Sequence, residues 1–410
     1  MTVNTYRLIQ QTPMIHFQSS EDGATLRASE VKPKLDRFIL KQLERERKAV
    51  PDEWYVSAEH PALNYKLRFR AEGTPRISND AETFIGSNRV SPQSAQRYTP
   101  KIHANYFGNM VDLRGANSVA EKSARVRAAF KETLQYDTVV MTVVCFNGAL
   151  LTELDRYLPY FFALSAFGTR SSKGFGCFSV KGRAADDEAL LKCCPLNIYY
   201  SVTYGKQSPN DLLNAIWVIN GMMKGGFNFT FRNPNDYYKG HIFRYYTEKG
   251  VGGDKAFMKQ RVLTRGSDTN PDSEERSRYT EFRFVRAMLG LPGGYEFKAG
   301  RNGEKTTRSG KVDVSSDDIA RFQAPVHYRV QGDKLLIIPQ SIPAEMEGAR
   351  FSLNSGSIKT PEDFDLIDFL DSFVRRFNSK EDIKRFQSRE VRIPLITNNM
   401  QIKKHGGDAS

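Results

Sequence analysis

The chain has few cysteines, no long hydrophobic run and no basic segment followed by an apolar one at its start. Its four cysteines form no CxxC pair, so neither a zinc site nor a disulfide framework is indicated. The longest uncharged apolar stretch, residues 138–152, falls short of the roughly 20 residues that a membrane helix needs. A secretory signal is not indicated either. We therefore expect a protein of the reducing cytoplasm, without a membrane partner.

Positive charge is what the chain has in excess. Among its 410 residues, 60 Lys and Arg stand against 47 Asp and Glu, a formal net charge of +13. Hydrophobic residues make up 40% and aromatic residues 11%, which excludes global disorder and allows two or three folded domains. The charge favours a polyanion as partner, or marks a soluble basic protein.

The first half predicts strands alternating with helices. A first strand over residues 6–17, interrupted at Pro13, precedes a helix capped by Ser29 that runs to about Arg47. Asp137–Phe146 reads as a strand, Asn147–Ala166 as a helix, and Phe175–Lys181 as a further strand after a glycine-rich loop. Strand, helix, loop and strand in this order are half of a split βαβ, ferredoxin-like domain.

A second round of the same elements is predicted further along. A strand over 195–204, a helix starting at Ser208-Pro209 and a hairpin over 326–339 precede a helix capped at Thr360. We therefore expect an α+β protein with tandem ferredoxin-like (RRM-like) domains and long insertions. The predicted boundaries are 1–190, with an insertion at about 73–117 and a glycine-rich loop at 168–176, then 191–340, and then a C-terminal helical extension over 341–410. We expect residues 298–318 to be a mobile loop and residues 403–410 to be frayed.

The sharpest motif is the glycine-rich loop, FGTRSSKGFGCFSV over Phe167–Val180. Its glycines permit tight turns and close approach to a ligand, and exposed backbone N–H groups in such a loop can hold phosphate oxygens. Phe175 is a candidate stacking surface for a base. An ordinary glycine-rich hairpin is the alternative. The order helix, loop, strand argues against a dinucleotide site, which needs its glycines between a strand and a helix.

Four segments of the chain together resemble a known family. The loop is similar to the signature loop of the RAMP superfamily of CRISPR-associated proteins, although Ala166-Phe167 replace the glycines usual before Arg170. TPMIHF followed by Leu26–Ile39, then Arg286–Gly294, then Ala320–Val330 look like segments of the Cmr-type RAMP subunit of type III effector complexes.

The resemblance implies binding of single-stranded RNA within an RNA-guided complex. Its partners would be guide RNA (crRNA), near whose 3′ end it is thought to lie, target RNA and other subunits, and no cofactor or metal is expected. The residues carried over are Arg27, Ser29, Lys32 and Lys34 at the first helix, Arg170, Ser171, Ser172, Lys173, Gly174 and Gly176 in the loop, and Arg321 and His327 in the second half. Arg37 joins them from the basic face of the first helix, for which a plain solvated face is an equal alternative.

Two alternative functions stay open. A metal-independent endoribonuclease would use a histidine to move a proton from the RNA 2′-hydroxyl, and His16 is the best candidate, although a structural role fits it better. We expect no catalysis. A basic protein-interaction module is the other alternative. Asp363, Asp365, Asp368 and Asp371 suggest the acidic face of an amphipathic helix more than a metal site.

Overall fold

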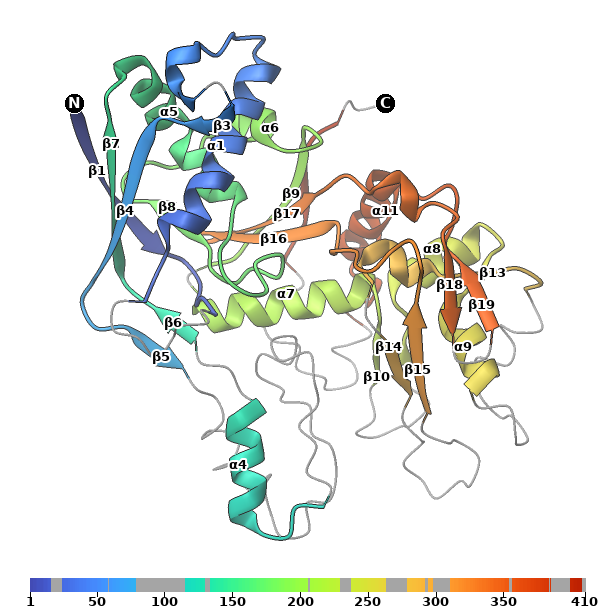
Figure 1. Cartoon of the computed structure of the whole chain (residues 1–410). Coiled ribbons are helices and arrows are strands. Elements are labelled where there is room, and N and C mark those ends of the chain that lie inside the picture. Colours follow the sequence, from blue (N-terminus) through green and yellow to red (C-terminus); the bar gives the residue numbers. More distant parts are fainter. Residues whose placement is uncertain are drawn as a thin grey trace. The chain divides into compact units, whose positions relative to one another are not determined.

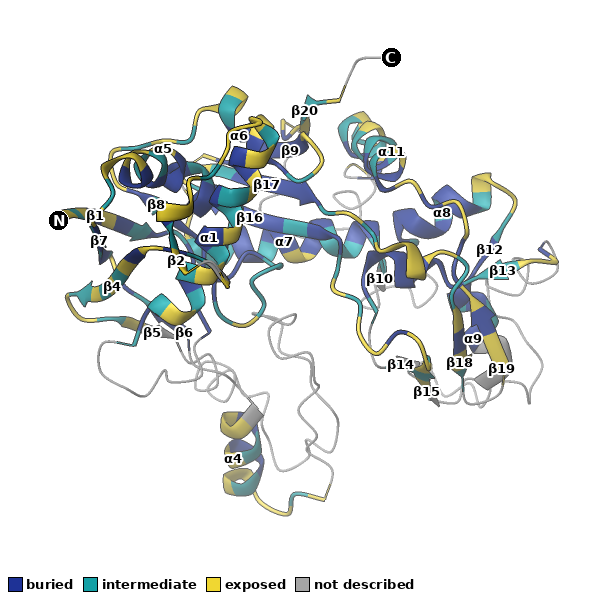
Figure 2. Cartoon of the chain, turned by 45° about the horizontal axis from the view of Figure 1, so that its top comes forward, coloured by how far each residue is buried: buried dark blue, intermediate teal, exposed yellow. Residues whose placement is uncertain are grey.

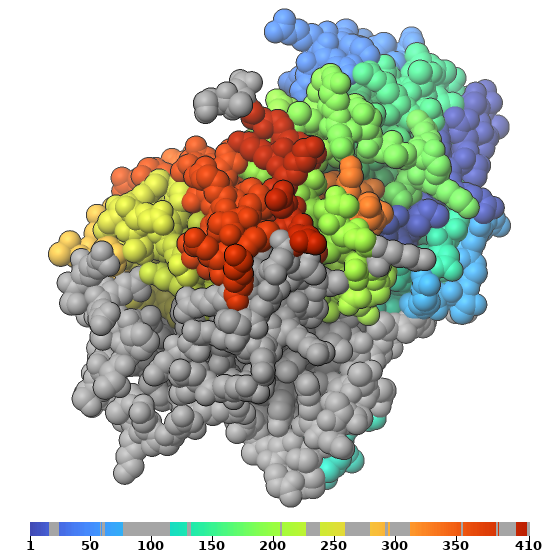
Figure 3. All heavy atoms as spheres, turned by 180° about the vertical axis from the view of Figure 1, so that it is seen from behind, coloured from blue at the N-terminus to red at the C-terminus, as the bar shows by residue number. Residues whose placement is uncertain are grey.

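A computed structural model gives the fold of the chain (Figures 1 and 3). It describes residues 1–15, 24–57, 59–78, 115–129, 133–205, 207–228, 237–262, 279–291, 294–297, 310–353, 356–382, 384 and 399–407. The chain divides into two compact units. The first unit comprises Met1–Ile216, Tyr328–Ile338 and Lys404–Ser410, and the second comprises Trp217–His327 and Pro339–Lys403.

The first unit opens with a four-stranded antiparallel sheet in the order β4-β7-β1-β8 (Figure 1). Its strands are β1 (Thr2–Gln10), β4 (Tyr65–Glu72), β7 (Thr138–Cys145) and β8 (Phe178–Val180). Helix α1 (Ala28–Arg45) lies between β1 and β4 in the chain, and α5 (Gly148–Leu164) lies between β7 and β8. The chain therefore runs strand-helix-strand-strand-helix-strand, as in a split βαβ fold.

One face of this sheet forms the core with both helices. On α1, Leu35, Ile39 and Leu43 recur every four residues and are almost fully buried, as the helical period predicts. Asn147 caps α5, since its side chain accepts the N–H of Leu150 at 2.9 Å.

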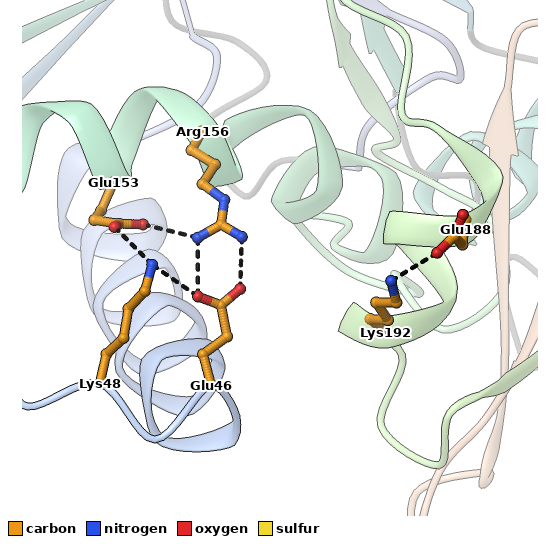
Figure 4. Close-up of polar contacts among 6 residues, drawn as sticks. All are labelled: Glu46, Lys48, Glu153, Arg156, Glu188 and Lys192. Atoms are coloured by element: carbon orange, nitrogen blue, oxygen red, sulfur yellow. Dashed lines mark hydrogen bonds and ion pairs between the residues drawn. The ribbon is translucent and has the colours of Figure 1, made fainter.

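Ion pairs join the end of α1 to α5 (Figure 4). Arg156 on α5 contacts both carboxylate oxygens of Glu46, at 2.6 and 2.9 Å. Lys48 contacts Glu46 at 2.9 Å and Glu153 at 3.2 Å. Because the Arg156 guanidinium donates to it from two nitrogens, the pKa of Glu46 falls to about 2.

A second four-stranded sheet repeats the order of the first. Its order is β16-β17-β9-β20, and its strands are β9 (Ile198–Thr203), β16 (Val326–Gln331), β17 (Lys334–Pro339) and β20 (Lys403–Gly406). Helix α7 (Pro209–Met223) follows β9, and α11 (Leu366–Ser379) precedes β20. We number the four strands of each sheet by their order in the chain. In both sheets the second strand lies at one edge, followed by the third, the first and the fourth.

The long connection between α7 and β16 supplies most of the second unit. It contains β10 (Phe227–Asn228), β11 (Tyr237–Tyr238), α8 (His241–Glu248), β12 (Gly252–Gly253), α9 (Asp254–Val262), β13 (Phe282–Arg283), η3 (Val285–Leu289), β14 (Gly294–Phe297) and β15 (Gly310–Ser315). With β18 (Arg350–Leu353) and β19 (Gly356–Lys359), the last two form a sheet in the order β14-β15-β18-β19. A buried ion pair at 2.6 Å between Arg286 and Asp254 ties η3 to α9.

Short elements complete the description. They are η1 (Asp52–Trp54), β2 (Tyr55–Ser57), β3 (His60–Leu63), β5 (Arg76–Ser78), α4 (Val119–Ala129), β6 (Thr133–Gln135), α6 (Asp187–Cys193) and η4 (Ala344–Met346). No described helix is long and apolar enough to cross a membrane. The mixture of helices and antiparallel sheets confirms the predicted α+β class.

The structure corrects two predicted helix caps. Arg27 is the N-cap residue of α1, so Ser29 lies in its first turn and does not cap it. Helix α11 begins after Asp365, whose carboxylate accepts the N–H groups of Ile367 at 2.7 Å and Asp368 at 3.0 Å, so Thr360 does not cap it. Thr360 is buried and its hydroxyl donates to the carbonyl of Met346 instead.

Two segments differ from their predicted structure. Strand β15 lies within the predicted loop 298–318. Its Val312 is 1% exposed, although the surrounding sequence is polar and gave no indication of a buried residue. Strand β20 lies within the end predicted to fray. Most of the predicted insertion at 73–117 lies outside the described residues.

Candidate nucleic-acid interface

The glycine-rich loop, residues 168–176, connects α5 to β8 and is held by backbone hydrogen bonds on two sides. The N–H of Thr169 donates to the carbonyl of Ile15 at 3.1 Å, and the N–H of Gly176 donates to that of Pro13 at 2.9 Å. On the other side, the N–H of Tyr328 on β16 donates to the carbonyl of Ser172 at 3.0 Å. The loop is therefore a fixed part of the first unit.

The glycines serve packing within the chain. Gly174 and Gly176 have φ of +84° and +66°, in the left-handed region, and both are buried. A Cβ on Gly176 would lie 2.0 Å from the Phe167 carbonyl oxygen, and one on Gly174 would lie 2.3 Å from Cδ1 of Ile216. The backbone turns so tightly here because it approaches its own chain, which corrects the expectation that these two glycines bring it close to a phosphate.

Arg329 on β16 holds the loop from within, and sequence reasoning missed it. Its guanidinium is buried and donates to the carbonyls of Leu164 at 2.9 Å, Ser171 at 2.8 Å and Tyr328 at 2.7 Å. Burial lowers its pKa. A basic residue between the apolar residues Tyr328 and Val330, at the centre of a predicted strand, is the signal that could have identified it.

The polar side chains at the tip of the loop remain accessible. Thr169 is exposed, and Arg170, Ser171, Ser172 and Lys173 are half-buried. Arg170 has a left-handed φ of 60°, which is strained for a residue with a Cβ, and the N–H of Lys173 closes the turn by donating to its carbonyl at 2.8 Å. The tip thus presents two cations and three hydroxyls.

The ammonium of Lys173 lies over the ring of Tyr328, 5.6 Å from its centroid. Burial, reinforced by the charge of Arg170, lowers the pKa of Lys173 to about 8. An anion bound beside these two cations would relieve their repulsion.

Phe175 does not provide the predicted stacking surface. Its side chain is 3% exposed and belongs to the interior of the first unit. A ring buried to this extent offers no face on which a base could stack.

The start of α1 lies against the start of the loop. Glu30 in the first turn accepts the N–H of Gly168 at 3.2 Å. Lys34 pairs with Glu30 at 3.0 Å and lies over the ring of Phe167, 4.8 Å from its centroid. The structure therefore brings together two segments that are 138 residues apart in the chain.

The remaining candidates on α1 differ in how accessible they are. Ser29 and Arg37 are exposed and Arg27 is half-buried. Lys32 is committed to the fold, since its ammonium contacts both Asp36 and the carbonyl of Leu63 at 2.7 Å. It also lies over the ring of Tyr65, at 4.4 Å. Lys32 thus has less to offer a ligand than the others.

Two candidates belong to the second unit. Arg321 is exposed in the coil before β16, and His327 is half-buried within that strand. His16, the candidate proton-transfer residue, lies outside the described residues. On α11, Asp368 accepts the hydroxyl of Tyr245 at 2.7 Å, and no group of metal-ligating side chains occurs in the part of the chain that the structure describes.

Comparisons with known proteins identify the two halves of the chain. Residues 1–227 match the family model for the Cmr1 N-terminal domain, and residues 237–401 match the model for the Cmr1 C-terminal domain. No curated protein matches the chain.

Two solved structures resemble the chain over most of its length. The apo crystal structure of Cmr1 from Pyrococcus furiosus is 9% identical with a TM-score of 0.36, covering 84% of this chain and 90% of the other. A chain in the cryo-EM structure of the Type III-B Cmr-beta complex bound to cognate target RNA and AMPPnP, in the presence of ssDNA, is 10% identical with a TM-score of 0.33, covering 91% and 98%. These values are too low to inform the function of this chain.

Proposed function

Because the chain belongs to the Cmr1 family of RAMP proteins, we propose that it is an RNA-binding subunit of a type III CRISPR effector complex. The observation that carries the proposal is the match of both Cmr1 domains, in order, over residues 1–227 and 237–401. The proposed partners are guide RNA, near its 3′ end, target RNA and the other subunits of the complex, in the cytoplasm.

The loop and the start of α1 form the proposed RNA site. Arg170 and Lys173 would neutralise phosphates, and Ser171 and Ser172 would donate hydrogen bonds to them. The first turn of α1, at the positive end of the helix dipole, and the half-buried Arg27 support an anion beside the start of the loop. Glu30 and the burial of Phe175 limit the site to the backbone of the RNA.

The repeated strand order supports the proposal that the chain contains tandem ferredoxin-like folds. Both four-stranded sheets use their first, second, third and fourth strands in the same arrangement. The boundaries 1–190, 191–340 and 341–410 stay a prediction.

Salt dependence of RNA binding tests the site. Replacing Arg170 and Lys173 by Ala in the full chain should lower the slope of log K against log salt by roughly 1.4 for single-stranded RNA, since each lost phosphate contact accounts for about 0.7. Lys192→Ala with Arg375→Ala removes the same charge from two exposed positions and should leave the slope unchanged. Equal slopes for both double variants would contradict the site.

The proposed role is recognition without cleavage. A hairpin RNA incubated with the chain, without added metal, should stay intact. Cleavage that disappears in His16→Ala would establish the endoribonuclease alternative instead.

A further inference from the structure

None of the helices in the described part of the chain covers the second face of the first sheet, and this face is cationic. Residues of β4 alternate, so that Tyr65 points into the core while Lys66, Arg68 and Arg70 are exposed. Figure 2 shows exposed residues along β4 and β1, the strands at either side of β7.

The strand register places the residues of this open face in three rows. Lys66 lies beside Val144 and Val3, Arg68 beside Thr142 and Thr5, and Arg70 beside Val140 and Arg7. Thr142 and Thr5, which lie beside Arg68 in the middle row, are short and polar. Successive cations on β4 are about 6.8 Å apart along the strand.

Little on the described face neutralises this charge. Glu72 at one end pairs with Arg7 at 3.5 Å and with Arg70 at 3.4 Å. Lys66 and Arg68 have no ion pair with any residue that the structure describes. Arg7 and Arg70 also shield Val140, which is only 8% exposed although it lies between them on the open face, so their aliphatic stems lie along the sheet.

We propose that the open face of the β4-β7-β1 sheet binds the phosphates of single-stranded RNA, as a second contact surface apart from the glycine-rich loop. The cations on β4 are spaced regularly, at about the distance between successive phosphates of an extended RNA strand. Such a row matches a polyanion whose charges repeat at a constant distance. The carboxylates of a folded protein have no such repeat. No aromatic residue occupies the three rows, so the contact should be independent of base sequence.

One aromatic residue stands at the end of this face. Phe146 directly follows β7 and is 70% exposed, near the row formed by Lys66, Val144 and Val3. A base of an RNA bound along these rows would stack on it.

The test uses the full chain and a fluorescein-labelled 20-nucleotide oligouridylate, with Kd followed by anisotropy as KCl is varied. Replacing Lys66, Arg68 and Arg70 by Gln should lower the salt slope by roughly 2. The matched control replaces Lys192, Arg350 and Arg375 by Gln, which removes the same charge from exposed positions of other elements and should leave the slope unchanged. If the triple variant unfolds, Arg68→Glu alone carries the test, because that side chain is exposed and unpaired among described residues.

Phe146→Ala separates stacking from charge. It should raise Kd at least about fivefold and leave the salt slope as in the unmodified chain. An oligocytidylate of equal length should bind with the same affinity.

Three outcomes would overturn the proposal. The first is a slope in the triple variant equal to that of its control. The second is a triple variant that binds RNA as the unmodified chain does but no longer binds polyglutamate, which serves as an alternative probe. That result would assign the face to an acidic polypeptide. The third is an unmodified chain that does not bind RNA, which would also refute the proposed function.

The loop variant Arg170→Ala with Lys173→Ala, measured in parallel, keeps the two proposals distinguishable. If only the loop variant loses affinity, the proposed function stands and the second surface is refuted. If only the sheet variant loses affinity, the second surface stands and the loop is refuted as the RNA site.

Discussion

The glycine-rich loop and strand β4 are both basic, but they use their charges in different ways. In the loop, the backbone is tied to Pro13, Ile15 and Tyr328, and two of its glycines and Phe175 are buried. In β4, the cations Lys66, Arg68 and Arg70 occupy alternate positions and are exposed to solvent. Glycines and basic residues clustered in sequence therefore mark a tightly packed turn, whereas the most accessible row of charge lies in a strand with no unusual motif.

The largest effect should come from a side chain added inside the loop. Gly176→Ala places a Cβ against the Phe167 carbonyl at a left-handed φ, so the backbone must shift, and we expect a loss of more than about 3 kcal/mol in unfolding free energy. Gly182→Ala has a similar φ of +75° with nothing within 4 Å, and should cost only about 1–2 kcal/mol. Urea unfolding measures both, and equal losses would show that the loop is not packed as described.

Removing the buried guanidinium that holds the loop should have the next largest effect. Arg329→Met leaves the carbonyls of Leu164 and Ser171 without their donor, and we expect a loss of roughly 2 kcal/mol together with faster amide exchange in the loop. Arg321→Met, at an exposed position, should change stability by less than about 0.5 kcal/mol. An unchanged exchange rate at Lys173 and Tyr328 would contradict the role of Arg329.

Raising the pH should remove the charge that Lys173 contributes to the loop. Since the pKa of Lys173 is about 8, its charged fraction falls about tenfold between pH 7 and 9, and RNA affinity should fall by up to that factor. Lys173→Arg should abolish this dependence. The lowered pKa also means that the folded chain binds fewer protons than the unfolded one between pH 8 and 10.5, so this group makes stability rise with pH there. If the RNA affinities of the unmodified chain and of Lys173→Arg change equally with pH, Lys173 is excluded as an RNA contact.

The smallest effect on stability should come from Glu46, a surface carboxylate that forms ion pairs with Arg156 and Lys48. The lowered pKa of Glu46, about 2 against an ordinary 4.5, means that its stabilising contribution is complete above pH 4.5 and is lost as the pH falls toward 2. Its side chain is 31% exposed, so solvent screening limits the contribution to about 1 kcal/mol.

Measuring the free energy of unfolding from pH 5 to pH 2 tests this contribution of Glu46. Glu46→Gln should flatten the pH dependence, whereas Glu188→Gln should not, since Glu188 is 78% exposed and pairs with Lys192 across a single contact of 2.7 Å (Figure 4). A steeper profile in Glu46→Gln would contradict the assignment.

Local pattern predicted the elements whose environment is uniform along their length. Helices α1 and α5, strand β7 and the β16–β17 hairpin follow directly from helical or alternating periodicity, within a few residues at their ends. Strands β15 and β20 did not, since their polar sequences become strands only through pairing with distant neighbours.

The site was harder to predict for the same physical reason. Which of the alternating residues of β4 face solvent depends on where α1 and α5 pack. The approach of Glu30 to Gly168 joins residues far apart in the chain, and no local pattern encodes it. The sequence motif identified the right segment, but its residues divide between packing and exposure according to tertiary contacts.

The path of the chain has a consequence for any attempt to dissect the protein. The polypeptide crosses between its two compact units four times, at 216/217, 327/328, 338/339 and 403/404. A fragment ending at residue 227 would carry β9 but lack β17, whose residues 334–337 pair with 200–203. A single protease nick at any crossing would leave three covalent tethers intact, so the halves of this molecule have to be studied together.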